Sequence, residues 1–397
     1  MTEVLHLTPH LGGGIGKAIS GLVKQSTETK SEFRHAVVCL EKPIRYQYID
    51  KIHECRDEGK VREGKIIICP TYDELEKLMK ESDIVQLNWI NHPVIIKYLN
   101  NVKCSFIRLI TWCHNNGLYS DNIKEPGKLP PIIPEKLILA SDKFIFTTEC
   151  SFDAKVVKKI LEEHPYIRKI LGIVYSSGGF GGLLDPELKD SFSSFSSDSM
   201  SVGYFGTINF AKIHLKYVDF LEKVDIPGFK VKIVGEISEE IRNQLNKQCK
   251  EIGKSGMLEF TGYIEKQEEL IKELSKINVL AYILNPRHYG TTENALLETM
   301  SMGIVPIVLN NLPEKYLVED RKTGFVVKDP KEFGEVIRLL YENPDERQRI
   351  GLQSARYVRK NFTAEKTINN LNFHYRNMMK MKKRDIDFTD IFRLEDK

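Results

Sequence analysis

The sequence predicts an α/β protein with two domains, each built on a parallel β-sheet. A chain of 397 residues is longer than one typical hydrophobic core organises. Short apolar runs with strand character alternate with helix-period segments along most of this length. The alternation is interrupted by the stretch LKDSFSSFSSDSM, which has little to bury and is typical of a linker. We therefore expect domains at 1–185 and 201–362, a linker at 186–200, and a C-terminal segment at 363–397.

Composition and charge exclude several classes of protein. Hydrophobic residues make up 41% of the chain and charged residues 28%, as in soluble globular proteins. A net charge of +3 gives no support for nucleic-acid binding. The seven cysteines are odd in number and form no CxxC pair, which argues against a disulfide framework and against a zinc site. With no signal segment and no run of about 20 apolar residues, we expect a cytoplasmic protein, with peripheral contact at the inner membrane face left open.

A glycine-rich loop follows the first expected strand, residues 4–8. A P-loop would need a glycine at Leu11 and a Ser or Thr at Ala18, so that interpretation fails. The dinucleotide pattern would need a third glycine at Lys17 and fails too. What remains is a strand-to-helix turn in which Gly13 and Gly14 let the backbone approach a ligand closely; a plain tight turn explains it equally well.

Polar residues stand at the ends of two further expected strands. Strand 83–88 ends at Asn88 and is followed by Trp89, and strand 105–112 is followed, one residue later, by His114. Ligands of open parallel sheets gather at the carboxyl ends of strands, so these side chains are candidates for a binding cleft. A single histidine in this position is also compatible with a purely structural hydrogen bond.

The other expected elements continue the alternation. In the first domain we expect strands at 35–40, 65–69, 143–148 and 172–175, and helices from about 15, at 72–80 and at 152–163. In the second we expect strands at 201–206, 231–234, 258–261 and 278–283, and helices at 212–223, 239–250 and from about 267. Three C-terminal helices are expected at 331–342, 345–361 and 364–383.

The most informative stretch is YGTTENALLETMSMGIVPIVLN, residues 289–310. The loop Gly290-Thr291-Thr292 precedes a helix-period segment, and a glycine and an apolar strand at 304–309 follow. A small-residue loop at a helix start offers free backbone N–H groups and the positive end of the helix dipole, which suit a diphosphate. Glu298 lies further along, where a carboxylate could accept hydrogen bonds from a ribose. An ordinary capped helix followed by a buried strand is the alternative.

Within this stretch, LLETMSMGIVPIV resembles the donor-site signature of family 4 glycosyltransferases. That family has the GT-B fold, in which two Rossmann-like, doubly wound domains face each other across a cleft. Its signature contains two glutamates; the second matches Glu298, which the resemblance assigns to the ribose, and the first falls on Gly290. Glu293 is a candidate substitute, although it lies about 140° from Glu298 around a helix and could act only from the loop or first turn. Alternatively, Glu293 complements the helix dipole.

The resemblance also assigns roles elsewhere in the second domain. The family has an arginine and a lysine that grip the diphosphate; Thr207 replaces the arginine and Lys212 matches the lysine. A lysine at a helix start conflicts with the dipole, and this conflict favours an anionic ligand there. The turn containing Tyr263 and Ile264 would pack against the nucleotide base, with Tyr263 stacked on it or simply packed in the protein.

In the first domain, the resemblance places Gly13 and Gly14 opposite the donor phosphate and His114 against the transferred sugar, with general acid/base catalysis as a second role. Asn88 and Trp89 would lie on the acceptor side. The last helix would return from the second domain to the first.

The resemblance implies a retaining, metal-independent glycosyltransferase without a cofactor. The donor would be a UDP- or GDP-linked sugar and the acceptor a glycan or glycolipid, in polysaccharide or glycoconjugate biosynthesis. His114 and Glu293 are the catalytic candidates. Because Gly290 and Thr207 remove two family side chains, a non-catalytic GT-B-like accessory subunit is one alternative, and a nucleotide-sugar epimerase is another.

Overall fold

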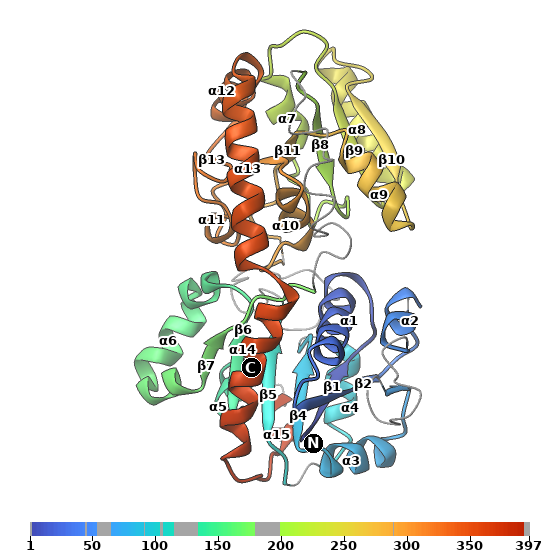
Figure 1. The fold of residues 1–397 in the computed structure, drawn as a ribbon, viewed down its shortest axis with the longest axis vertical. Helices are drawn as coiled ribbons and strands as arrows, with labels where there is room; N and C mark the ends of the chain where they lie inside the picture. Colours follow the sequence, from blue (N-terminus) through green and yellow to red (C-terminus); the bar gives the residue numbers. More distant parts are fainter. Residues whose placement is uncertain are drawn as a thin grey trace. The chain divides into compact units, whose positions relative to one another are not determined.

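The computed structural model describes residues 2–43, 46–53, 65–90, 92–103, 106–114, 134–178, 199–288 and 290–392. Figure 1 shows the fold. The chain forms two compact units. The first comprises Met1–Gly179, Gly290–Thr292 and Thr363–Lys397, and the second comprises Phe180–Tyr289 and Glu293–Phe362. The expected linker at 186–200 lies almost wholly outside the described residues.

The first unit is built on a seven-stranded parallel sheet in the order β3-β2-β1-β4-β5-β6-β7. From β1 the chain moves outward through β2 and β3, then returns to place β4 on the other side of β1. The sheet order therefore reverses between β1 and β4, and loops at such a reversal form the usual ligand site of open α/β sheets. The strands are β1 (Thr2–Thr8), β2 (Phe33–Cys39), β3 (Ile66–Ile68), β4 (Ile84–Asn88), β5 (Leu109–Cys113), β6 (Lys143–Phe146) and β7 (Leu171–Ile173).

Helices cover both faces of this sheet. One face packs against α1 and the C-terminal helix α14, whose Ile368, Leu371 and Tyr375 join Leu22 and Trp112 in one buried cluster. The other face packs against α3, α4, α5, α6 and the short α15. The helices are α1 (Gly13–Glu28), α2 (Gln47–His53), α3 (Tyr72–Glu81), α4 (Pro93–Leu99), α5 (Pro134–Ala140), α6 (Lys155–Glu163), α14 (Ala364–Met379) and α15 (Phe388–Phe392), with 3₁₀ turns η1 (Glu149–Asp153) and η2 (Pro165–Lys169).

The second unit repeats the plan with a six-stranded parallel sheet in the order β10-β9-β8-β11-β12-β13. Here the order reverses between β8 and β11. The strands are β8 (Val202–Phe205), β9 (Val231–Val234), β10 (Leu258–Gly262), β11 (Val279–Tyr282), β12 (Val305–Leu309) and β13 (Phe325–Val327). The helices are α7 (Tyr217–Glu222), α8 (Glu239–Glu251), α9 (Gln267–Leu274), α10 (Asn294–Ser301), α11 (Glu314–Leu317), α12 (Pro330–Glu342) and α13 (Pro344–Asn361).

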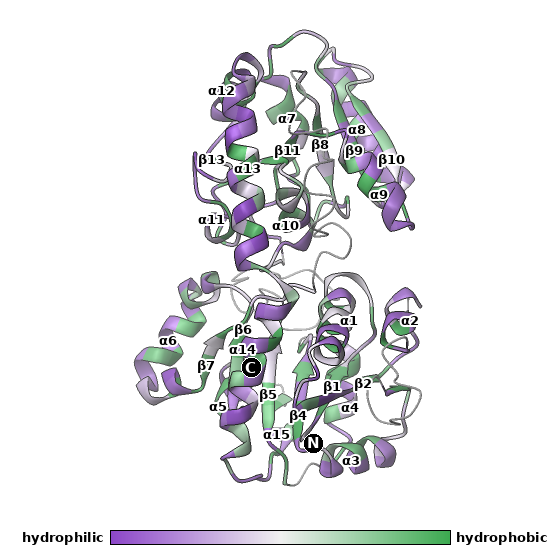
Figure 2. Ribbon diagram, viewed as in Figure 1, coloured by the Kyte–Doolittle hydropathy of each residue, from purple (hydrophilic) through white to green (hydrophobic). Residues whose placement is uncertain are grey.

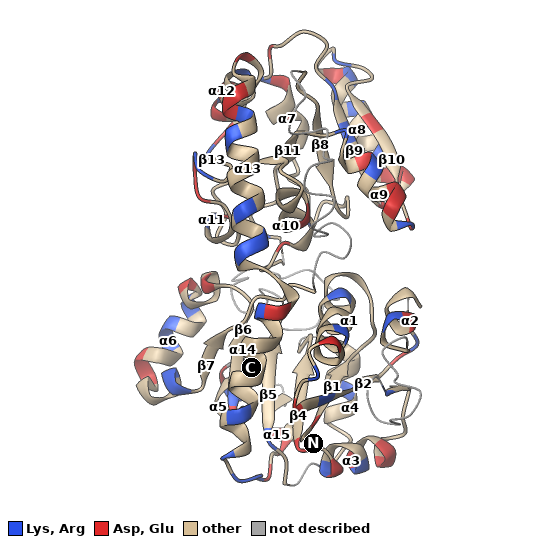
Figure 3. Ribbon diagram, in the orientation of Figure 1, with Lys and Arg blue, Asp and Glu red and all other residues tan. Residues whose placement is uncertain are grey.

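Burial on both faces explains why the central strands are mostly apolar and carry no charged residue. Every residue of β4, β5, β11 and β12 is buried, and parallel sheets covered by helices select continuous apolar runs. Hydrophilic residues lie along outer helices such as α12 and α13 (Figure 2). Lys, Arg, Asp and Glu gather on helices and loops and are missing from these four strands (Figure 3).

Several expected elements differ from the structure. The helix expected to begin at Lys212 begins at Tyr217, and the last long helix ends at Met379 rather than near 383. The helices α2, α4 and α5, each seven residues long, were not expected, because so short a segment carries little periodicity. No helix in the described part of the chain is both long enough and apolar enough to cross a membrane.

Gly21→Ala should destabilise the first unit by about 1–2 kcal/mol. In an open helix this change would stabilise by up to about 1 kcal/mol. In α1, however, the new Cβ would lie 1.8 Å from the carbonyl oxygen of Gly178, and overpacking of this kind costs about 1–3 kcal/mol. Chemical unfolding measures the difference, with Lys24→Ala on the exposed side of α1 as the control. Unchanged or increased stability of Gly21→Ala would contradict this close packing.

Candidate functional site

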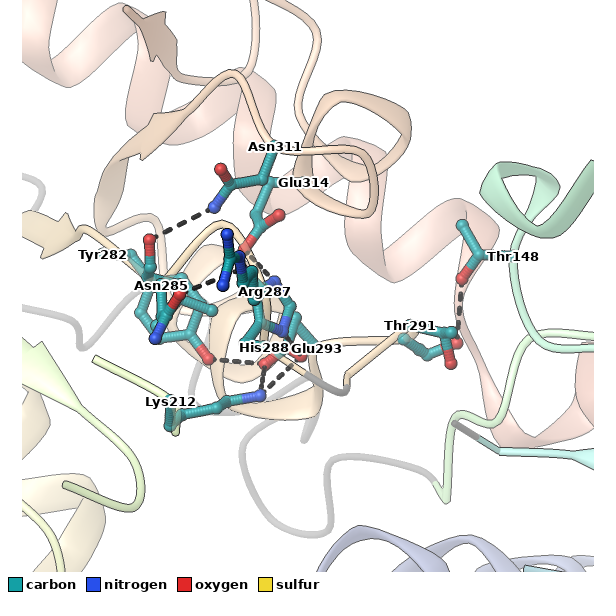
Figure 4. Close-up of polar contacts among 12 residues, drawn as sticks. Thr148, Lys212, Tyr282, Asn285, Arg287, His288, Thr291, Glu293, Asn311 and Glu314 are labelled. Carbon is teal, nitrogen blue, oxygen red and sulfur yellow. Dashed lines mark hydrogen bonds and ion pairs between the residues drawn. The ribbon is translucent and has the colours of Figure 1, made fainter. Parts of the chain in front are cut away.

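A buried ion pair stands at the reversal of the second sheet (Figure 4). Lys212 lies in the loop after β8, and Glu293 precedes the first residue of α10 in the loop after β11. Because β8 and β11 are parallel neighbours, their carboxyl-end loops meet. Lys212 Nζ donates to both Glu293 carboxylate oxygens, at 2.6 and 2.5 Å. The side chains are only 12% and 4% exposed.

Three more side chains complete a polar network around this pair. The Tyr282 hydroxyl, at the end of β11, donates to Glu293 Oε2 at 2.8 Å. His288 Nδ1 lies 3.6 Å from Glu293 Oε1, and His288 Nε2 lies 2.8 Å from Glu314 Oε1. The side chains of His288 and Glu314 are fully buried. A buried carboxylate is thus surrounded by an ammonium group, a phenol and an imidazole.

The network sets the protonation of its members. Burial alone would raise the pKa of Glu293, but the charges of Lys212 and His288 and the hydrogen bonds from Lys212 and Tyr282 together lower this pKa below its ordinary value. Burial, and next the neighbouring Glu293 carboxylate, raises the pKa of Tyr282, which therefore stays a hydrogen-bond donor. Glu293 is ionised and its lone pairs are directed at Lys212 and Tyr282.

Two interpretations of the sequence change at this point. The expected conflict between Lys212 and a helix dipole is wrong, because α7 begins five residues later and a side-chain carboxylate is the anionic partner of Lys212. Glu293 occupies the N-cap position of α10, yet its side chain makes no capping hydrogen bond. Its carboxylate instead accepts hydrogen bonds from Lys212 and Tyr282, so a simple dipole role does not describe it.

The loop Gly290-Thr291-Thr292 groups with the first unit. The Thr291 hydroxyl donates to the backbone oxygen of His114 at 3.2 Å and lies 2.5 Å from the Thr147 hydroxyl. The Thr292 hydroxyl donates to the backbone oxygen of Thr147 at 2.7 Å. Both threonines precede the first residue of α10 rather than forming its first turn.

The remaining donor-side candidates of the second unit are spread over its sheet. Glu298 lies on α10 and is 5% exposed. Thr207 follows β8, and its backbone oxygen accepts a hydrogen bond from Tyr204 at 3.2 Å. Tyr263, which is 47% exposed, and Ile264 follow β10, at the edge of the sheet two strands away from β8. The structure brings Lys212 and Glu293 together, whereas Tyr263 and Ile264 belong to a separate turn.

In the first unit, two sequence-predicted residues meet at the ends of β4 and β5. His114 Nε2 lies 3.3 Å from Asn88 Oδ1. The amide nitrogen of Asn88 donates to the backbone oxygen of Leu7 at 3.2 Å, so Oδ1 is the acceptor. Nε2 of His114 therefore carries the proton and Nδ1 presents a lone pair.

A buried relay that the sequence analysis missed supports this contact. Gln86 Nε2 donates to Asn88 Oδ1 at 3.1 Å, and the Tyr375 hydroxyl on α14 donates to Gln86 Oε1 at 2.5 Å. Gln86, Asn88 and Tyr375 are fully buried. The signal in the sequence is the polar Gln86 inside the otherwise apolar strand IVQLN. Hydrogen bonds thus connect the C-terminal helix with His114.

Burial lowers the pKa of His114 to about 3. The imidazole is therefore neutral near neutral pH. It can accept a hydrogen bond through Nδ1, but its one proton, on Nε2, faces Asn88 and is too weakly acidic for general acid catalysis.

The reversal between β1 and β4 carries two unusual backbone conformations. Gly13, the first residue of α1, has φ +54° and is exposed, as is Gly14. Trp89, directly after β4, has φ +58°, which is rare for a residue with a large side chain. The Trp89 conformation costs about 1–3 kcal/mol, and strained residues of this kind occur preferentially at functional sites, whereas glycine adopts a positive φ without this cost.

Among the described residues, two groups could hold a metal ion. One comprises His10, Glu41 and His92, and the other comprises Glu135, Glu163 and His164. The first lies at the same reversal as Trp89, whose ring centroid is 5.2 Å from that of His10 and 5.0 Å from that of His92.

Comparison with known proteins gives a match to one family model and a shared fold. Residues 189–356 match the family model of glycosyl transferases group 1. No sequence match was found among curated proteins.

Similar solved structures cover nearly the whole chain. They include HepE of Anabaena in complex with UDP and glucose (12% identity, 95% of this chain, 100% of that chain, TM-score 0.67). A glycosyltransferase from Rickettsia africae is also similar, with 14% identity over 96% of this chain and 99% of that chain and a TM-score of 0.68. Sucrose-phosphate synthase from Thermosynechococcus elongatus has 14% identity over 96% of this chain and 100% of that chain and a TM-score of 0.66. The predicted fold class, α/β with two Rossmann-like parallel sheets of the GT-B type, is confirmed. The predicted cleft between the two domains stays a prediction.

Proposed function

We propose that this protein moves a sugar from a nucleotide-diphosphate sugar to an acceptor hydroxyl, and the match of residues 189–356 to the family model of glycosyl transferases group 1 supports this proposal. The observation that carries the proposal is the Lys212–Glu293 pair at the β8–β11 reversal. It puts an ammonium group and the positive end of α10 at the place where an open α/β sheet binds ligands.

In this proposal the donor diphosphate shares Lys212 with Glu293. A diphosphate carries more negative charge than a carboxylate, so it can draw the ammonium group toward itself while Glu293 keeps the lysine aligned. The charge that develops on the leaving diphosphate is then stabilised electrostatically. Glu293 would in this way replace the glutamate that is missing at Gly290.

We assign finer roles on the same basis. Glu298, which is 5% exposed, binds the ribose. His114, held by Asn88, accepts a hydrogen bond from a sugar hydroxyl through Nδ1. Retention at the anomeric carbon, a glycan or glycolipid acceptor, and chemistry that needs no metal at the diphosphate are parts of the proposal. HepE was solved with UDP and glucose, so a UDP-linked hexose is the first donor to test.

A thermal-shift screen against UDP, GDP and their sugars tests donor binding. At about 100 times its Kd, a ligand that binds only the folded protein adds about 2.7 kcal/mol of stability. We expect the correct nucleotide to raise the Tm by roughly 5–10 °C. Lys212→Met should reduce this increase, whereas Lys230→Met, which changes an exposed lysine of the same unit, should not. If no nucleotide or nucleotide sugar shifts the Tm, the glycosyltransferase proposal fails.

A second measurement separates the alternatives. Donor binding without hydrolysis or transfer would favour an accessory subunit. A changed sugar released in the absence of an acceptor would favour an epimerase. Transfer or slow donor hydrolysis with an unchanged sugar would favour the glycosyltransferase.

A further inference from the structure

Three side chains from distant parts of the sequence meet at the carboxyl edge of the first sheet. We name His10, Glu41 and His92 the His–Glu–His cluster. His10 follows β1, Glu41 follows β2, and His92 is the N-cap residue of α4, after β4. Nε2 of each histidine lies 3.7 Å from Glu41 Oε1, and one ligand atom from each of the three residues lies within 4.8 Å of the others.

Backbone contacts hold the three residues in place. The Glu41 N–H donates to the backbone oxygen of Pro9 at 2.9 Å, which ties Glu41 to the residue before His10. The His92 N–H donates to the backbone oxygen of Trp89 at 3.2 Å. His10 is 5% exposed, and its ring packs edge-on against both Trp89 and His92. The cluster is thus fixed by neighbouring structure rather than formed by flexible surface side chains.

The spacing of the three donor atoms suits a small divalent cation. A point equidistant from three atoms separated by such distances lies roughly 2.1–2.4 Å from each, close to the usual zinc–ligand distances of about 2.0–2.2 Å. Imidazole nitrogen with a carboxylate oxygen is a common donor set for Zn²⁺ and for neighbouring first-row metals.

We propose that His10, Glu41 and His92 form a binding site for a divalent transition metal such as Zn²⁺. Three protein ligands leave at least one coordination position for water or for an oxygen atom of a ligand, as in catalytic rather than structural zinc sites. Glu41, whose side chain is 37% exposed, leaves this position accessible. The proposal does not depend on the glycosyltransferase function.

Metal binding has one structural cost, which also gives a diagnostic signal. In the structure, His92 Nδ1 accepts a hydrogen bond from the Val94 N–H at 3.3 Å, so the proton of a neutral ring is on Nε2. Coordination through Nε2 moves this proton to Nδ1, and the Val94 contact is lost. One long, neutral hydrogen bond is a small loss against a metal–ligand bond. His10 Nδ1 is buried and has no hydrogen-bond partner among the described residues, so its proton displaces no existing bond.

Titration of the full-length protein with Co²⁺, followed by visible absorption, tests the site. We expect one equivalent to bind with ligand-field bands and to be displaced by Zn²⁺. His92→Ala, Glu41→Gln and His10→Ala should each weaken binding by at least about tenfold. His164→Ala is the matched control, because it removes a ligand from the other candidate group, and it should leave binding unchanged. Thermal unfolding of each variant without metal shows whether it is folded.

Two results would overturn the proposal. One is the absence of Co²⁺ and Zn²⁺ binding at millimolar concentration. The other is binding that survives in folded His92→Ala and Glu41→Gln, the two variants that alter the more exposed ligands. Nitrogen NMR of the histidine rings gives an independent check: Zn²⁺ should move the His92 proton from Nε2 to Nδ1, and an unchanged tautomer would contradict coordination by His92.

Discussion

Glu293→Ala should destabilise the second unit by about 3–5 kcal/mol, because removing one partner of a buried ion pair leaves the other charge uncompensated. Lys212, whose side chain is only 12% exposed, would lose its carboxylate partner, and Tyr282 would lose its acceptor. His288 would keep Glu314 but lose its second acidic neighbour. This is a much larger effect than that of an ordinary surface substitution.

The measurement has to report on the second unit. Both tryptophans of the chain, Trp89 and Trp112, belong to the first unit, so tryptophan fluorescence would miss this change. Hydrogen exchange of the backbone amides of β11 and α10 during urea unfolding reports on the second unit. Glu259→Ala is the matched control. Glu259 Oε1 lies 2.6 Å from Lys230 Nζ, but the side chains of Lys230 and Glu259 are 60% and 49% exposed. That change should cost less than about 1 kcal/mol. A similar cost for the two variants would contradict the buried ion pair.

Lowering the pH from about 7 to about 5 should cost the first unit about 4 kcal/mol through two histidines. His6 and His35 lie on β1 and β2, are 0% and 1% exposed, and contact each other at 2.8 Å. Burial lowers the pKa of His35 to about 3 and, with the neighbouring His35 and His114, lowers the pKa of His6 well below its usual range.

The sign follows from proton binding. Between about pH 6.5 and the lowered folded-state pKa of each ring, which is about 3 for His35, the unfolded chain binds protons on these rings and the folded unit does not. Stability from this source is therefore present above the unfolded pKa and is lost as the pH falls, by about 1.4 kcal/mol per histidine per pH unit.

Urea unfolding at several pH values, followed by tryptophan fluorescence, measures this dependence in the first unit. The double variant His6→Leu/His35→Leu should remove the part of the pH dependence that these two rings contribute, while other buried histidines of the first unit, such as His114, keep contributing. Gln replacement of His53, an exposed histidine, should leave the wild-type slope. A wild-type unfolding free energy that does not change between the two pH values would rule out the buried neutral pair.

The sequence predicted the fold because each strand and helix carries its own local signal. The apolar runs of β4 and β12 mark buried strands, and alternation with helices implies parallel order. Lys212 shows where local signals fail. The residues after it look helical, but Ile213 forms an isolated antiparallel bridge with Leu284, which keeps this segment out of α7. Tertiary pairing thus overrode local propensity.

The candidate sites were predictable only in part. Asn88 and His114 follow from strand ends alone, and the structure places them in contact. Lys212 and Glu293 are separated by 81 residues in the sequence, and no local sequence pattern predicts that they pair. The His–Glu–His cluster could not be predicted from the sequence for the same reason. Metal-binding motifs are recognised by short spacings between ligands, whereas these three ligands come from three separate βα loops. The expectation of no metal site rested on those spacings, and our zinc proposal departs from it.

The position of α14 determines how this protein can be dissected. Residues 364–379 fill one face of the first sheet, although they follow the second unit in the chain. A fragment ending near residue 178 would expose the apolar surface that Ile368, Leu371 and Tyr375 cover and would leave Gln86 without its tyrosine. Separate production of the first unit therefore calls for a fusion in which a flexible linker joins residue 178 to residue 363.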